Sequence, residues 1–404
     1  MMRMVVHYAA AALIMWGLFS VPAAARDVNL DGIYIKKSSV YSTRLSDAKL
    51  DLYQAAGASF ADSNVSFAGW SSGSRLIYVR ETAADTQVVE YFPSSRSSRI
   101  IASIRGAAVY AQIPSGGSWA YIKMMVPGKD IVPDYVLCVV DLRSGTVQRY
   151  PSKHLFIDYA VSRYGESFVT EEGNVLTERF PATGRTLSLL NRAQYGSVAR
   201  KDALLAGFPS PDARRILVLS GGGGNYDAAV FENGRKTFAV EGVSSAAELL
   251  WIDNQRLAYR EGSPGHFTVK IFNCADGSAM SLGGPTMNTN ISFSQYNNLL
   301  TFLSDGAVSF YHVRSGAQEI YPLEGEDVAF APGGNIFCTL YGGRLFIVQR
   351  EMMKSRSVEL RRAAQKILGL YRELLKTPGD FENIYSREYI RRKIDLYAKL
   401  TDLK

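Results

Sequence analysis

The chain has 404 residues, of which 47% are hydrophobic and 21% are charged, and its formal net charge is +7. This balance excludes a disordered chain, and the length allows one large domain or two to three ordinary ones. The 23 tyrosines, 19 phenylalanines and 35 glycines, against 14 prolines, favour β structure built from strands and glycine turns.

The first 25 residues have the pattern of a secretory signal peptide. Arg3 supplies a positive charge, a mostly apolar run follows from residue 5 to residue 21, and three alanines end just before Arg26. An uncleaved membrane anchor is the alternative, although the run is at the short end for a span of about 20 residues. We therefore expect cleavage before Arg26 and a periplasmic or otherwise extracytoplasmic location.

One unit recurs along the chain at intervals of 36 to 49 residues, the length of a four-stranded propeller blade. Each copy has a turn residue followed, three positions later, by an apolar residue that begins a strand. The turn residues are Gly73, Gly116, Gly165, Ala213, Asn254, Asn297 and Gly333. Polar turns of a second hairpin follow in most copies, at residues 142–146, 181–185, 232–235, 275–278 and 313–317. The pattern predicts an all-β, seven-bladed β-propeller over residues 26–350.

The seventh copy contains three strands and then changes into a charged helical pattern near Lys354. An N-terminal strand, at residues 32–35 or at residues 39–42, is expected to complete this blade and close the ring. The competing count has six complete blades and a remnant, with residues 28–66 as a separate element.

A family resemblance rests on residues 207–218, whose run Phe208-Pro209-Ser210-Pro211-Asp212-Ala213 resembles the turn of TolB-like and WD40-like propeller repeats. Residues 330–336 are a looser second match. The resemblance covers roughly residues 60–350 and implies a propeller fold, but many unrelated propellers share this turn, so it does not imply an activity. The chain departs from TolB in having no room for an N-terminal α/β domain and in carrying a C-terminal helical tail.

Residues 351–404 form a basic tail with 13 Lys or Arg residues against 8 Asp or Glu residues. Two amphipathic helices are predicted, separated by Pro378-Gly379-Asp380. The first helix begins at Ser355 or Ser357, and its apolar face comprises Leu360, Ala364, Ile367, Tyr371 and Leu374. Ser386 is expected to cap the second, whose apolar residues are Tyr389, Ile390, Ile394, Tyr397 and Leu400.

The tail has two interpretations. It is either a helical hairpin packed on the flank of the propeller with solvated charges, or a docking element for a partner protein, an acidic polymer or a membrane surface. The candidate partner-binding residues are Arg361, Arg362, Arg391, Arg392 and Lys393. Because acidic residues are interleaved with the basic ones, and an exported protein rarely meets nucleic acid, we expect no nucleic-acid partner.

No motif of the chain indicates catalysis, a cofactor or a metal site. The histidines outside the signal peptide, His154, His266 and His312, lie in different repeats, and there is no G-x-S-x-G elbow. The glycine run at residues 220–225 lacks the rest of a phosphate loop and is expected to be a hairpin loop. The acidic run at residues 324–327 is expected to be a solvated turn, with a calcium site as the alternative.

Two further expectations concern thiols and loops. Cys138, Cys274 and Cys338 each lie among strand residues, so we expect buried free thiols rather than a disulfide framework. The long loop at residues 126–134 and the glycine loop are the best candidates in the ring for an interaction surface.

The leading hypothesis is a non-catalytic protein-binding or scaffold component of an envelope assembly outside the cytoplasm, with an envelope or periplasmic protein as partner. The rival is an enzyme or small-ligand receptor, with acidic, His or Asn side chains converging in the central channel. A peptidoglycan or polysaccharide binder is a third possibility, which the tyrosine content permits.

Overall fold

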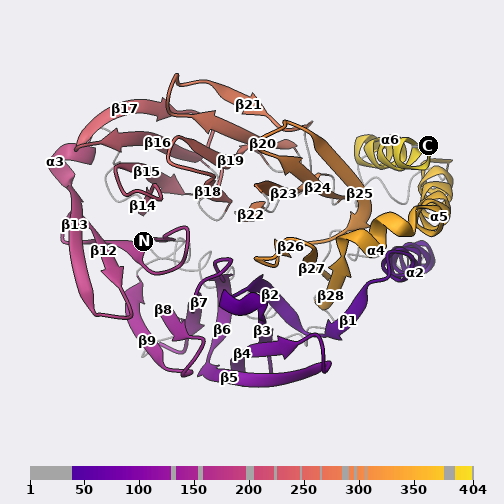
Figure 1. The fold of residues 1–404 in the computed structure, drawn as a ribbon, viewed down its shortest axis with the longest axis horizontal. Coiled ribbons are helices and arrows are strands. Elements are labelled where there is room, and N and C mark those ends of the chain that lie inside the picture. Colours follow the sequence, from indigo (N-terminus) through magenta and orange to yellow (C-terminus); the bar gives the residue numbers. More distant parts are fainter. Residues whose placement is uncertain are drawn as a thin grey trace, which may run out of the picture.

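The computed structural model describes residues 39–128, 133–152, 158–196, 204–222, 225–245, 248–263, 266–283, 291–294, 298–304, 307–376 and 387–402. Its strands form seven four-stranded antiparallel sheets, arranged as the blades of a ring, and the N-terminal and C-terminal helices lie outside the ring on one side (Figure 1). The predicted seven-bladed β-propeller is confirmed, and the count of six blades and a remnant is wrong. The predicted signal peptide lies outside the described residues.

The first four blades follow the chain from the inner strand to the rim. Blade 1 comprises β2 (Val65–Trp70), β3 (Leu76–Glu81), β4 (Asp85–Phe92) and β5 (Ser97–Arg105). Blade 2 comprises β6 (Ala107–Gln112), β7 (Trp119–Val126), β8 (Asp134–Asp141) and β9 (Val147–Ser152). Blade 3 comprises β10 (Tyr159–Val161), β11 (Phe168–Glu172), β12 (Val175–Phe180) and β13 (Arg185–Asn191), followed by the short helix α3 (Arg192–Tyr195). Blade 4 comprises β14 (Leu204–Pro209), β15 (Arg215–Gly222), β16 (Asn225–Glu232) and β17 (Arg235–Val240).

The last three blades end in a ring closure by the N-terminal part of the chain. Blade 5 comprises β18 (Leu249–Trp251), β19 (Arg256–Ser263), β20 (His266–Asn273) and β21 (Ala279–Ser281). Blade 6 comprises β22 (Ile291–Ser294), β23 (Leu299–Ser304), β24 (Ala307–His312) and β25 (Gln318–Glu324). Blade 7 comprises β26 (Asp327–Phe330), β27 (Ile336–Tyr341), β28 (Arg344–Gln349) and, as its rim strand, β1 (Ser59–Asp62).

The second and third strands of most blades bury apolar residues on both faces, because each blade is covered by a neighbour on either side. In β3, all four residues from Leu76 to Val79 are fully buried. The rim strands differ, since β5 begins with four exposed residues. This gradient explains why the sequence shows short continuous apolar runs rather than strict alternation.

The predicted repeat turns connect the first and second strands of their blades. The backbone has a positive φ at four predicted positions, Gly73, Gly116, Gly165 and Ala213. At Gly165 the φ is 70°, and a Cβ atom would also lie 2.7 Å from Cγ of Pro114 in blade 2, so glycine is required there twice over. In blade 7 the positive φ falls at Gly334, one residue after the predicted position, and Asn297 lies outside the described residues.

Ring closure by an N-terminal strand is confirmed, but the predicted position of that strand is wrong. The closing strand is β1, which pairs antiparallel with β28 so that Phe60 lies opposite Phe346. Residues 39–42 belong instead to helix α2 (Ser39–Ala55), and residues 32–35 lie outside the described residues. The helical period was readable in the sequence, because Leu45, Ala48 and Leu52 fall at i, i+3 and i+7 and are all buried.

The C-terminal segment forms a short helix α4 (Arg350–Ser355) and two long helices, α5 (Ser357–Lys376) and α6 (Arg387–Asp402). These two long helices confirm the predicted tail, and α5 begins at one of the two predicted positions. The N-terminal helix α2 lies beside α5 (Figure 1). Together, α2, α5 and α6 form what we call the helical layer.

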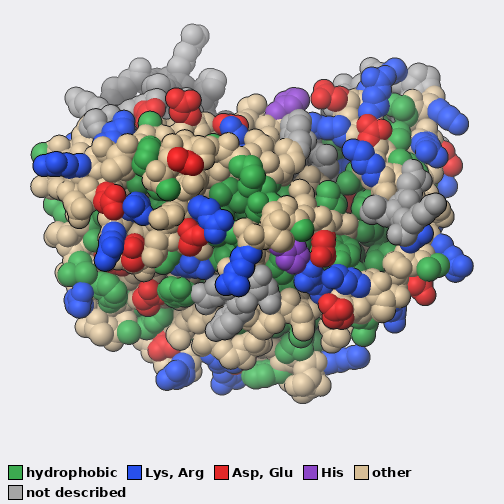
Figure 2. Space-filling model, turned by 45° about the horizontal axis from the view of Figure 1, so that its top comes forward, with side chains coloured by type: hydrophobic (Ala, Val, Ile, Leu, Met, Phe, Trp, Pro, Cys, Tyr) green, Lys and Arg blue, Asp and Glu red, His purple; other side chains and the backbone are tan. Residues whose placement is uncertain are grey.

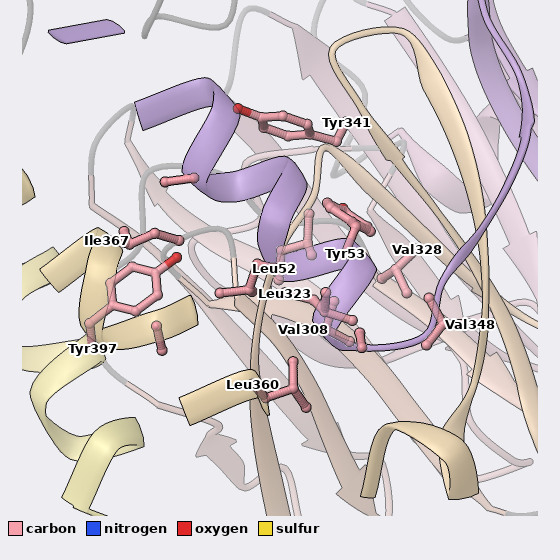
Figure 3. Close-up of a cluster of buried hydrophobic side chains, with 14 of the residues drawn as sticks. Leu52, Tyr53, Val308, Leu323, Val328, Tyr341, Val348, Leu360, Ile367 and Tyr397 are labelled. Atoms are coloured by element: carbon pink, nitrogen blue, oxygen red, sulfur yellow. The ribbon is translucent and has the colours of Figure 1, made fainter. Parts of the chain in front are cut away.

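The helical layer shares one hydrophobic core with blades 6 and 7. Leu52 and Tyr53 of α2, Leu360 of α5 and Tyr397 of α6 meet strand residues such as Leu323 (Figure 3). The ring of Tyr53 stacks on that of Phe346 with centroids 4.3 Å apart. The tail is therefore packed on the propeller, and the layer is part of the folded core rather than an appendage.

We predict that Leu52→Ala lowers the free energy of unfolding by about 2–5 kcal/mol, because it opens a cavity at a fully buried leucine. Urea unfolding followed by circular dichroism measures the change. The matched control is Gln54→Ala two residues away on the same helix, where the side chain is exposed and the change is expected within about 0.5 kcal/mol. Equal stability of both variants would show that α2 is not part of the core.

Candidate docking surface of the helical layer

Glu324 anchors the helical layer to the ring. It ends β25 at the junction of blades 6 and 7, and the residue is only 6% exposed. Lys49 of α2 places its Nζ atom 2.9 Å from Oε2 of Glu324, and Lys393 of α6 places its Nζ atom 3.2 Å from Oε1. Tyr397 donates a hydrogen bond to Oε1 at 2.6 Å, and the Tyr53 hydroxyl donates to the Glu324 carbonyl oxygen. We call these five residues the Glu324 cluster.

The electrostatics of the Glu324 cluster favour an ionised carboxylate. Burial alone would raise the pKa of the Glu324 carboxyl, but the ammonium groups of Lys393 and Lys49 outweigh burial and lower this pKa to about 2. Burial, together with the nearby negative charge of Glu324, raises the pKa of Tyr397 well above its usual value, so this hydroxyl stays a donor. The cluster is a buried salt bridge. Removing the carboxylate or the ammonium groups leaves a buried charge without its partner.

The expectation of a solvated turn at residues 324–327 is therefore wrong for Glu324. Glu326 is exposed and accepts a hydrogen bond from the Gly342 amide. Burial raises the pKa of Asp327, the first residue of the inner strand β26, to about 6. Among the residues that the structure describes, no group of three or more His, Cys, Asp or Glu side chains is placed to hold a metal ion.

Four of the five predicted partner-binding residues keep some exposure, and one does not. Arg362 and Arg391 are exposed, whereas Arg361 and Arg392 are half-buried. Arg392 lies 4.0 Å from Glu388 one turn earlier on α6. Lys393 is 1% exposed and belongs to the Glu324 cluster, so it is not available to a partner on the surface.

Helix α5 presents a stripe of cations to solvent. Five exposed residues follow the helical period on one face: Arg362, Gln365, Gly369, Arg372 and Lys376. None of these five residues is a carboxylate, although the exposed Glu373 lies directly beside them, and the three cations form no ion pair with any described residue. The neighbouring charges of α5 turn toward α2 instead, where Lys366 pairs with Asp51 and Glu373 pairs with Arg44.

Figure 2 shows many Lys and Arg side chains, with Asp and Glu between them, on the side of the molecule that carries the helices. Residues 26–350 carry almost no net charge, and the tail at residues 351–404 carries most of the excess positive charge. The exposed stripe of α5 is therefore a local positive region beside a nearly neutral ring. It was missed as a unit in the sequence, although the spacing of Arg362, Gly369 and Lys376 at i, i+7 and i+14 identifies it.

The other candidate groups are distributed over the ring. His312 ends β24, with Nε2 3.3 Å from both Glu319 and Arg350, while His266 begins β20 and His154 lies outside the described residues. The three cysteines are free and buried, as predicted. The two predicted interaction loops connect β7 to β8 and β15 to β16, and their central residues lie outside the described residues.

Carboxylates also lie at the inner strands of the ring. Asp158, just before β10, is 2.6 Å from Nζ of the fully buried Lys123, and Glu248, just before β18, pairs with Arg260. Burial raises the pKa of Tyr110 on β6, with smaller contributions from the charges of Glu248 and Asp327. Groups from blades 2, 5 and 7 thus come within electrostatic reach of one another.

Comparison with known proteins adds little beyond the fold. No family model matches the chain, and no curated protein matches it. The chain is similar to the structure of TolB from Acinetobacter baumannii, with a TM-score of 0.37, 15% sequence identity and coverage of 55% of each chain. It therefore spans about half the length of the structure it matches.

Among the described helices, none combines the length and hydrophobicity needed to cross a membrane. The resemblance to TolB-like propellers rests on the seven blades and leaves partners and activity as proposals.

We predict that Glu324→Gln lowers the free energy of unfolding by about 3–5 kcal/mol at neutral pH, because Lys49 and Lys393 lose the negative charge they share. The folded pKa of about 2 lies below the unfolded value of about 4.3, so this stabilisation is present above pH 4.3. It is lost as the pH falls toward 2, and the variant and the original protein should converge there. Urea unfolding across this range measures the difference.

Glu326→Gln is the control for that comparison, because Glu326 is exposed and its amide replacement still accepts from Gly342. Its stability should change by about 0.5 kcal/mol or less. A Glu324→Gln variant that is equally destabilised at every pH would contradict the ionised assignment.

Proposed function

We propose that this chain is a non-catalytic binding or scaffold protein of an envelope assembly, outside the cytoplasm, which docks an acidic partner protein on its helical layer. The observation that carries the proposal is the exposed stripe of α5, whose three cations have no ion-pair partner among the described residues, while the adjacent Glu373 pairs with Arg44. A rigid helix holds the backbone positions of its charged residues at fixed spacing, so docking costs little backbone entropy.

The location outside the cytoplasm rests on the pattern of the first 25 residues, which predicts export. An acidic partner surface is the complement of the stripe, and long-range attraction would speed the encounter. Arg391 on the exposed face of α6 extends the set of available cations. Acidic polymers and anionic membrane surfaces share part of this chemistry and are alternative outcomes of the test.

A second candidate is a small-ligand receptor or enzyme with its site in the central channel. It is favoured by the approach of Tyr110, Glu248 and Asp327 from three blades. Glu248 is already paired with Arg260, and Asp158 with Lys123, so much of this charge is neutralised within the protein. Docking on the helical layer is therefore the better supported proposal.

We predict that Arg362→Glu/Arg372→Glu reduces cross-linking of the exported protein to its envelope partner at least tenfold, because two cations of the stripe become repulsive. Cross-linking and mass spectrometry on intact cells identify the partner and measure the yield. Point substitutions are preferred to removing residues 352–404, because that deletion would strip Met353, Leu360 and Tyr397 from the core of blades 6 and 7.

The matched control is Arg149→Glu/Arg214→Glu, two exposed arginines in blades 2 and 4. It makes the same change in net charge away from the stripe and should retain the cross-link. An equal loss in both variants would indicate a general charge effect, and no loss in either would exclude the stripe as the docking surface.

A further inference from the structure

Arg163 reaches across the centre of the ring at one mouth of the propeller. It lies in the turn between β10 and β11 of blade 3, yet its guanidinium carbon is 4.9 Å from the ring centroid of Phe293 on β22 of blade 6. Blades 3 and 6 lie on opposite sides of the ring (Figure 1). The guanidinium is also 5.5 Å from the ring of its neighbour Tyr164. Two aromatic rings from opposite blades therefore hold one cation over the channel mouth.

The hydrogen-bonding groups of Arg163 are unpaired within the described part of the chain. It is half-buried, and it forms no hydrogen bond or ion pair with any described residue. Burial lowers the pKa of Arg163 from its usual value, but an arginine stays charged at neutral pH. An arginine has five N–H donors, so this position combines partial desolvation with unused donors.

Other half-buried arginines that contact aromatic rings are satisfied by a carboxylate. Arg179 lies 5.6 Å from the Tyr150 ring and pairs with Glu172. Arg260 lies 4.0 Å from the Phe267 ring and pairs with Glu248. Arg350, at the start of α4, lies over Phe310 and pairs with Glu319. Arg163 has the same aromatic support without the anion.

Asp253 is the carboxylate whose charge acts on Arg163, but its oxygens are occupied. The guanidinium of Arg256 donates to Oδ2 at 2.8 and 2.7 Å. The backbone amides of Gln255 and Arg256 donate to Oδ1 at 2.9 and 2.7 Å. Asp253 therefore leaves the donors of Arg163 open to a ligand.

We propose that Arg163, held between Tyr164 and Phe293, binds an anionic group, a carboxylate or a phosphate, at this mouth of the channel. A guanidinium fork matches either group with two parallel hydrogen bonds, and contact with aromatic rings fixes its position in advance. The site lies in the ring and shares no residue with the helical layer, so it is independent of the proposed docking surface. The bound anion would lie on the face of the ring that carries the turns between the first and second strands of the blades.

The test uses the full exported chain, titrated by calorimetry with inorganic phosphate and, separately, with succinate, at an ionic strength held constant with sodium chloride. We expect binding of at least one anion, and a loss of at least tenfold in affinity in Arg163→Gln. The affinity of Arg163→Lys should lie between those of the original protein and Arg163→Gln, since lysine keeps the positive charge but loses the forked pair of donors. Binding of phosphate alone or of succinate alone identifies the chemical class of the anion. Binding of both shows that the site recognises the negative charge that they share.

Arg179→Gln is the matched control, because it removes an arginine with similar aromatic support whose donors are already used by Glu172. It should bind the anion as the original protein does. If Arg163→Gln does not fold, Phe293→Leu replaces it as the test variant, since it keeps the guanidinium, removes its support and should weaken binding several-fold. Absence of binding to the original protein, or equal binding by Arg163→Gln, Phe293→Leu and Arg179→Gln, would overturn the proposal.

Discussion

The buried carboxylate of Glu324 joins both ends of the described chain to the ring. The closing strand β1 contributes only four residues to blade 7, and a pairing of that length is weak by itself. Helix α2 immediately precedes β1 and is tied to Glu324 through Lys49 and Tyr53, while α6 is tied to the same residue through Lys393 and Tyr397. Closure of the propeller and attachment of the helices are thus parts of one arrangement.

This arrangement also decides which charges reach the surface. Lys393 and Tyr397 lie one turn apart on α6 and both face Glu324, so Arg391 and Lys399 turn toward solvent. On α5, the buried face from Leu360 to Leu374 directs Arg362, Arg372 and Lys376 outward. The positive stripe is a consequence of how the core orients each helix, and its position relative to the ring is fixed by that packing.

The repeats of the sequence predicted the blades well, because a strand–turn–strand unit is a local signal that glycine and apolar runs make visible. The six predicted turn positions that the structure describes fall between first and second strands, within a residue of the observed turns. The N-terminal helix was not predicted, although Leu45, Ala48 and Leu52 have a helical period and are all buried. The expectation of closure was right, and the segment assigned to it was wrong.

The Glu324 cluster was not predictable as a contact, because its members are far apart along the chain and no local pattern links Lys49 to Glu324. The position of Lys393 does indicate a buried ion pair, because Lys393 lies between Ile390 and Tyr397 on the apolar face of its helix. A lysine there must find a buried partner, since an unpaired ammonium group is costly to bury. Lys393 was grouped with its neighbours Arg391 and Arg392 as one basic run, although consecutive residues of a helix point to different faces.

Glu324 and Arg163 show two different uses of a charge removed from water. Glu324 is surrounded by cations and hydroxyls of this chain, so its ion pairs and hydrogen bonds stabilise the fold. Arg163 has rings on two blades to hold it and no carboxylate of its own within the described residues. Structural ion pairs such as Arg260–Glu248 show that the fold supplies anions to supported arginines elsewhere. An arginine that receives support but no anion is therefore better explained by a ligand than by the stability of the ring.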